Sequence, residues 1–163
     1  MATLAKTRGE RRAARRAGEG GKRVEYLSFG LAGETYAVAI ELVAEILRLP
    51  PITEVPRAPD TVLGVISVRG KLVTVIDLRR RFNLPAATLD RRSRILLADA
   101  RTEQIGLLVD DVQQVWRLAS EEIEPPSVLG GEQAPHIAGI GRPSGSDGTV
   151  LILLELRPLL EAT

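Results

Sequence analysis

The clearest pattern of apolar positions lies near the middle of the chain, where two runs rich in β-branched side chains flank a short polar break. The runs are residues 65–68 and 72–76. This pattern predicts a tight antiparallel hairpin, in which Gly70 supplies the positive φ of the turn. Asp77 follows the second run, and a carboxylate there can accept hydrogen bonds from the first amides of a helix. We therefore expect a short helix over residues 78–83.

The rest of the chain alternates short apolar segments with turn residues. Strands are predicted at residues 25–31, 35–38, 94–98, 104–109, 110–118, 137–141 and 150–154. The period changes at residues 40–47, where Ile40, Val43 and then Ile46 or Leu47 fall three or four positions apart, which predicts a short amphipathic helix. A terminal helix is expected at residues 155–161. Nine or ten short strands with few helices favour an all-β fold, either barrels or a sandwich.

Composition favours a compact protein without disulfides. The 163 residues suit one domain or two small intertwined ones, and an apolar content of 44% is enough for a core. The absence of cysteine excludes disulfides, thiolate metal ligands and cysteine nucleophiles, and fits a reducing compartment. No apolar run approaches the roughly 20 residues that span a bilayer, and the N-terminus lacks the apolar stretch of a secretory signal. We therefore expect a cytoplasmic protein.

Charge divides the chain into a basic leader and a mildly acidic remainder. Residues 1–23 carry eight Lys or Arg and two Glu, a net of +6, whereas residues 24–163 hold 14 basic and 19 acidic residues, a net of −5. The leader is poor in large apolar groups, so we expect it to be disordered. We interpret it as solubilising, with attraction to nucleic acid or anionic lipid as the alternative. Residues 24–163 are expected to fold, with a seam between two halves near the polar break at 85–92.

The residues that carry enzyme chemistry do not form a recognisable site. The single histidine, His136, lies in a Pro- and Gly-rich loop without cysteine or a second histidine for a metal shell. No G-x-S-x-G elbow occurs, and Asp110 and Asp111 would point to opposite faces of a strand. Residues 139–145 lack the Gly-Lys-Ser/Thr ending of a phosphate loop. The sequence therefore predicts a binding or scaffold protein without catalytic residues, metal, cofactor or small-molecule substrate.

Several positions suit contact with another protein. Val43, Glu45 and Ile46 combine apolar atoms with a carboxylate, and the alternative for Val43 and Ile46 is ordinary core packing. Gly64 leaves a gap nearby where another backbone could approach. Arg69, beside the glycine turn, could be a bidentate anchor for a partner's carboxylate or an internal brace. These residues are the candidate interaction surface.

Residues 64–79, GVISVRGKLVTVIDLR, resemble the signature of the CheW family of chemotaxis coupling proteins. Three further segments are similar to the family in the same order, at residues 36–46, 106–112 and 150–160. The resemblance covers about residues 25–161. It implies two packed five-stranded SH3-like β-barrels and a non-enzymatic scaffold that links the histidine kinase CheA to the cytoplasmic tips of chemoreceptors.

The resemblance also implies which residues contact each partner. The residues implied to contact the regulatory domain of the kinase are Val43, Glu45, Ile46 and Gly64. The residues implied to surround a groove that receives the receptor helix are Arg69, Ile95, Gly106 and Val112. An apolar groove that accepts an amphipathic helix is a recurring mode of recognition, in which a few apolar anchors supply most of the affinity.

The chain departs from the family pattern at three positions. Ser67 stands where the family usually has Asn, Thr74 where it often has Pro, and Ala39 where it often has Asp. Loss of the Asn amide removes two donors from the turn region, which bears on receptor choice. Two alternatives to flagellar chemotaxis remain open. One is an adaptor of a pathway that controls pili or development, and the other is a nucleic-acid-binding β-barrel with a basic arm.

Overall fold

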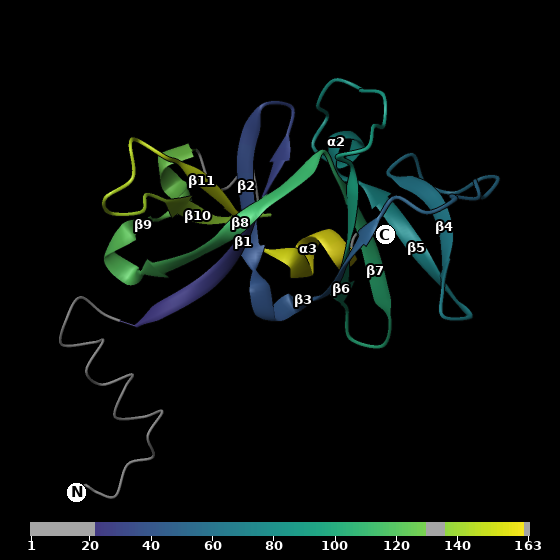
Figure 1. Cartoon of the computed structure of the whole chain (residues 1–163), viewed down its shortest axis with the longest axis horizontal. Helices are drawn as coiled ribbons and strands as arrows, with labels where there is room; N and C mark the ends of the chain where they lie inside the picture. Colours follow the sequence, from purple (N-terminus) through teal and green to yellow (C-terminus); the bar gives the residue numbers. More distant parts are fainter. Residues whose placement is uncertain (1–21, 130–135, 162–163) are drawn as a thin grey trace, which may run out of the picture.

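The computed structural model describes residues 22–129 and 136–161, which form two packed β-sheets (Figure 1). The six-stranded sheet has the order β8-β1-β2-β11-β10-β9 and consists of β1 (Arg23–Leu31), β2 (Glu34–Ala39), β8 (Asp111–Ala119), β9 (Ile123–Glu124), β10 (Ile137–Gly141) and β11 (Leu151–Leu154). The five-stranded sheet has the order β3-β6-β7-β5-β4 and consists of β3 (Val43–Arg48), β4 (Val62–Val68), β5 (Lys71–Asp77), β6 (Arg94–Asp99) and β7 (Gln104–Val109). The helices are η1 (Ile40–Leu42), α2 (Leu78–Arg81), η2 (Ser120–Glu122), η3 (Pro126–Leu129) and α3 (Leu156–Glu161). The prediction of an all-β fold with two packed subdomains is confirmed.

Most predicted elements correspond to observed ones. The predicted hairpin is β4–β5, and the strands predicted at 25–31 with 35–38 and at 94–98 with 104–109 pair as the hairpins β1–β2 and β6–β7. The Asp77 cap is present, since its carboxylate accepts a hydrogen bond from the Arg79 amide at 3.0 Å. One sheet has six strands instead of the expected five because β9, a two-residue strand, adds to β10. Strand β1 begins at Arg23, inside the range predicted as the leader, and residues 1–21 lie outside the described residues.

The predicted helix over residues 40–47 is wrong. The 3-10 turn η1 covers only its first three residues, and the chain then continues as strand β3. Half-buried and exposed side chains alternate from residue to residue along β3, which is the period of a strand. A bulge between Val43 and Glu45 shifts the register by one residue. The turn and the bulge together produce the three-residue spacing of apolar positions that a helix would also show.

The polar segment 85–92 is not a boundary between the two sheets. It lies between α2 and β6, and the strands on either side of it, β5 and β6, both belong to the five-stranded sheet. The chain passes between the sheets at η1 and again at Asp110, which separates β7 from β8. The middle of the chain therefore forms one sheet and its two ends form the other. The parallel pair β2–β11 joins the two ends of the chain, and the parallel pair β5–β7 joins two strands of the middle.

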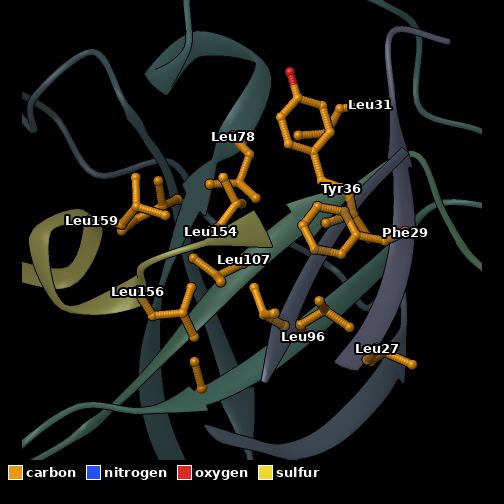
Figure 2. Close-up of a cluster of buried hydrophobic side chains, with 14 of the residues drawn as sticks. Leu27, Phe29, Leu31, Tyr36, Leu78, Leu96, Leu107, Leu154, Leu156 and Leu159 are labelled. Carbon is orange, nitrogen blue, oxygen red and sulfur yellow. The ribbon is translucent and has the colours of Figure 1, made fainter. Parts of the chain in front are cut away.

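A hydrophobic core shared by both sheets holds them together. Figure 2 shows its side chains converging, with Phe29 and Tyr36 from one sheet, Leu96 and Leu107 from the other, and Leu156 from α3. All five are buried. In Figure 1, α3 lies between the sheets, where it completes this core. Burying one large apolar side chain contributes about 1.5–3 kcal/mol, so this shared core is the main attraction between the two sheets.

The central strands are buried on both faces, which explains their continuous apolar runs. In β6, Leu96 and Ala98 belong to the shared core, whereas Ile95 and Leu97 belong to a second cluster on the other face of the five-stranded sheet. A third cluster, which includes Leu118, belongs to the six-stranded sheet. Side chains on these central strands are therefore unavailable to a partner, which leaves the outer strands and the turns.

An ion pair at the crossover between the sheets complements the shared core. The Arg79 guanidinium donates from Nε to Oδ1 of Asp110 at 2.8 Å and from Nη2 to Oδ2 at 2.6 Å. The Ala32 amide, in the β1–β2 turn, also donates to Oδ2, at 2.9 Å. The hydrogen bond from Arg79 holds the pKa of Asp110 below its ordinary value, against the opposing effect of partial burial. One carboxylate thus joins α2, the β1–β2 turn and the crossover.

We expect Leu107→Ala to lower the free energy of unfolding by about 3 kcal/mol, because it opens a cavity in the shared core. Urea denaturation followed by circular dichroism measures the change. The matched control is Leu72→Ala, since Leu72 is 76% exposed and its truncation should change stability by no more than about 0.5 kcal/mol. Equal effects of the two substitutions would contradict the assignment of the shared core.

We expect Asp110→Asn to lower the free energy of unfolding at pH 7 by about 1 kcal/mol, because it weakens a partly exposed, charge-assisted pair. The pKa of Asp110 is lowered in the folded state. Its stabilisation is therefore complete above the unfolded value of about 4 and is lost as the pH falls through the folded value. Urea titrations at pH 7 and pH 3 should show the gap between variant and unmodified protein narrowing at pH 3. A gap that stays constant would contradict the role of the carboxylate.

Candidate protein-binding surface

The outer strand β3 carries three of the four residues predicted to contact the kinase. Cross-strand partners in β6 show which way each side chain points. Val43 and Ile46 lie opposite shared-core residues, whereas Glu45 lies opposite Leu97 and faces the other side of the sheet. Ile46 is 44% exposed, and Val43 is half-buried against the shared core. The two sides of one sheet edge are therefore both available, with an apolar contact on one side and a carboxylate on the other.

The β4–β5 turn brings Arg69 to this strand. Arg69 and Gly70 have φ values of 49° and 81°, as the tight turn of a hairpin requires. The Arg69 guanidinium forms an ion pair with Glu45, and the two side chains are 70% and 35% exposed. The internal brace considered for Arg69 is therefore present, and most of its side chain still faces solvent. The pair joins a residue assigned to the kinase with one assigned to the receptor.

The gap expected beside Gly64 is filled by the chain's own backbone. Thr53 pairs with Val65 through two backbone hydrogen bonds of 2.8 and 2.9 Å. A Cβ at position 64 would lie 2.3 Å from the Thr53 carbonyl oxygen, so only glycine permits this close approach. Gly64 is buried. The backbone that approaches at this point belongs to the same chain, so the structure shows no open gap for a partner beside Gly64.

Two residues predicted to surround the receptor groove are interior. Ile95 is completely buried in β6 and Gly106 is buried in β7. A Cβ at Gly106 would lie 2.9 Å from Cγ2 of Ile95, so the two residues pack directly against each other inside the five-stranded sheet. They cannot touch a partner while the sheet is intact. The sequence could not show this, because both strands appear in it only as apolar runs.

The remaining members of the receptor set lie far apart. Arg69 is in the turn that precedes β5, whereas Val112 follows the crossover at the opposite end of the five-stranded sheet. Val112 is half-buried against the shared core. Seven residues of strand separate these ends, which corresponds to about 23 Å. The structure thus does not bring Arg69 and Val112 into one compact site.

The structure adds an apolar position that sequence reasoning missed. Leu72, the second residue of β5, is 76% exposed beside the β4–β5 turn. It lines an open groove of about 720 Å³ between that turn and the β6–β7 turn, together with Arg69, Lys71, Arg101 and Glu103. Leu72 begins an apolar run in which Val73 and Val75 are buried. In the sequence, only its position at the start of the strand separates this exposed leucine from the buried residues that follow. Exposed apolar atoms among charged groups are typical of protein-binding surfaces.

The described residues offer little that suggests catalysis. His136 stacks on the ring of Phe82 with centroids 4.5 Å apart, and burial, followed by nearby Arg81, lowers its pKa. Over residues 22–129 and 136–161, no three or more His, Cys, Asp or Glu residues gather as a metal site would require. Within the same ranges, no helix is long and apolar enough to cross a membrane.

Comparison with known proteins decides the family. The pattern of the CheW-like domain matches residues 25–163. The probable chemotaxis protein CheW of Rhizobium etli is 31% identical over 140 residues, which cover 85% of this chain and 88% of that protein. The solved structure of the scaffolding protein TtCheW from Thermoanaerobacter tengcongensis has a TM-score of 0.74 and 30% identity, and the match covers 85% of this chain and 92% of that one. This chain belongs to the CheW family.

Membership in the CheW family confirms the resemblance found in the central hairpin and agrees with the prediction of a non-enzymatic scaffold. The relatives extend beyond proteins named CheW. Protein FrzA of Myxococcus xanthus is 29% identical over 129 residues, which cover 79% of this chain and 81% of that protein. The relatives of this chain therefore carry more than one name.

We expect Gly64→Ala to destabilise the protein by about 1–3 kcal/mol, because the added methyl group collides with the Thr53 carbonyl. Urea denaturation measures the loss, and Ser67→Ala, at an exposed position on the same strand, is the control. Unchanged stability combined with weaker partner binding would show instead that Gly64 touches the partner directly.

Proposed function

We propose that this CheW-family protein is a cytoplasmic scaffold that couples chemoreceptors to a CheA-type histidine kinase. It binds the regulatory domain of the kinase and the cytoplasmic tip of a methyl-accepting receptor, and it performs no chemistry itself. Family membership supports a place in chemotaxis signalling. The observation that carries the proposal is the outer strand β3, where exposed Ile46 and the Glu45–Arg69 ion pair form a surface with both apolar and charged groups.

The kinase contact is proposed to centre on Ile46 and Glu45. Both are at a sheet edge, so one partner can reach both sides of the strand. The ion pair with Arg69 fixes the position of the Glu45 carboxylate without removing it from solvent. A carboxylate held beside an exposed apolar side chain can orient the partner, and the apolar side chain adds to the binding affinity. Val43 contributes by packing against the shared core on the same strand, and Gly64 contributes by letting Thr53 pack closely against β4.

The receptor contact is proposed to involve Arg69 and Val112, with Ile95 and Gly106 shaping the sheet beneath. Because Arg69 and Val112 lie near strand ends about 23 Å apart, a helix must be on the order of 15 residues long to reach both. Leu72 provides an apolar contact near the Arg69 end of such a helix. A long amphipathic helix is the kind of ligand that fits this length.

Nucleic-acid binding is less well supported. Small barrels that bind single strands normally offer aromatic side chains on which bases stack. Here Phe29 and Tyr36 are buried in the shared core. The folded part also carries a net charge of −5 over residues 24–163, which repels a polyanion. This alternative depended on the basic leader at residues 1–23, of which residues 1–21 lie outside the described residues.

We expect Glu45→Arg to weaken binding to the regulatory domain of the organism's CheA-like kinase by at least about tenfold, because it reverses the charge of the prepositioned group. Isothermal titration calorimetry at two salt concentrations measures the affinity. The matched control is Glu121→Arg, an exposed glutamate in η2 on the other sheet, which should bind normally.

The exchanged variant Glu45→Arg/Arg69→Glu distinguishes two causes of that loss. It retains the ion pair with its charges reversed. Recovered binding would show that the pair acts by holding the strand and turn together. Continued loss would show that the Glu45 carboxylate touches the kinase. No binding by the unmodified protein at either salt concentration would contradict the proposed function.

A further inference from the structure

Two arginines stand directly opposite each other at the edge of the five-stranded sheet. Arg48 of β3 pairs with Arg94 of β6 in the antiparallel register. Side chains directly opposite in such a pair point to the same face, with Cβ atoms about 5 Å apart, and like charges there are destabilising. The local sequence thus works against the stability of this pairing. Such a conflict is expected where a site serves a function.

Neither guanidinium is neutralised by a carboxylate. Within the described ranges, no ion pair involves Arg48 or Arg94. Arg94 is half-buried, and its Nη1 donates to the backbone carbonyls of Arg91 at 2.7 Å and Ser93 at 2.9 Å. These two bonds hold the guanidinium in position and leave its other donors free. Arg48 is exposed. The pair is therefore a fixed cation beside an adaptable one.

An apolar anchor lies on the same face. Ile46 is opposite Leu96 and two residues before Arg48, so both side chains are on the same side of β3. Ile46 is 44% exposed. An exposed apolar side chain beside two unpaired guanidiniums fits a protein segment that carries an apolar residue and carboxylates. Guanidinium groups bind carboxylates in a bidentate geometry that also fixes orientation.

The charge of the whole domain favours a local partner over an extended polyanion. Residues 24–163 carry a net of −5, so a nucleic acid or an anionic membrane would be repelled by most of the surface. A small number of carboxylates on a folded protein can approach the arginine pair without facing that repulsion, because charges separated by more than about 10 Å are largely screened. The partner is therefore a protein with an acidic patch.

We propose that Arg48 and Arg94 bind carboxylates of the kinase regulatory domain, next to the contact made by Ile46. This inference rests on the proposed kinase contact and adds to it the charge of the opposing surface. It predicts that the kinase regulatory domain carries an acidic patch that faces the Arg48 end of β3 in the complex.

The test is Arg48→Glu in the full-length protein, which has two effects of opposite sign. The new carboxylate faces Arg94, so the repulsion between the arginines becomes attraction and the Tm should rise. Binding to the kinase regulatory domain should weaken by about tenfold or more in calorimetry at low salt, with a smaller loss at high salt. Arg117→Glu, at an exposed position of β8 in the six-stranded sheet, makes the same charge change away from β3 and should leave the affinity unchanged.

Each other outcome has a distinct meaning. Unchanged kinase affinity of Arg48→Glu would overturn the inference and leave the proposed function intact. A fall in both Tm and affinity would overturn it too, because Arg48 would then act by stabilising the fold. Loss of binding to a receptor-tip fragment or to duplex DNA, with kinase binding unaffected, would assign the arginine pair to a different partner. Failure of the unmodified protein to bind the kinase would overturn the proposed function itself.

Discussion

The hydrophobic core between the two sheets is the constraint on which the rest of the structure depends. Because β6 and β7 are covered on both faces, the sites where another protein can bind are limited to outer strands, turns and the crossover. Strand β3 is the outer strand next to β6, so it exposes both sides of its edge while its inward side chains stay anchored. The position of the candidate surface thus follows from the packing between the sheets.

The Glu45–Arg69 ion pair is suited to a surface that changes partners. Exposed ion pairs contribute about 0–1 kcal/mol, because both charges are well solvated when apart. Breaking this pair therefore costs little, and either charge can be taken over by a partner's group of opposite sign. By contrast, the pair between Arg79 and Asp110 is bidentate and is supported by the Ala32 amide. One pair holds the sheets in place, and the other leaves its charges available.

Local features of the fold could be predicted from the sequence, and features that depend on distant segments could not. The β4–β5 hairpin and the Asp77 cap involve neighbours in the chain, and turn chemistry specifies them. Strand β3 was mistaken for a helix because its bulge imitates the helical period. The burial of Ile95 and the contact of Gly64 with Thr53 depend on which strands become neighbours. Ile95 is covered because β6 lies between β3 and β7, and Gly64 meets Thr53 at an isolated antiparallel bridge, and neither arrangement is apparent from the sequence.

The arginine pair at the end of β3 shows the same dependence. Arg48 and Arg94 are 46 positions apart in the sequence, so their repulsion becomes visible only when the register of β3 and β6 is known. Charged side chains at a sheet edge also discourage two copies of a protein from joining edge to edge. This role is compatible with binding a carboxylate, because a cation that repels a second copy attracts an acidic partner. Unpaired arginines on an outer strand can therefore both prevent edge-to-edge association of two copies and select an acidic partner.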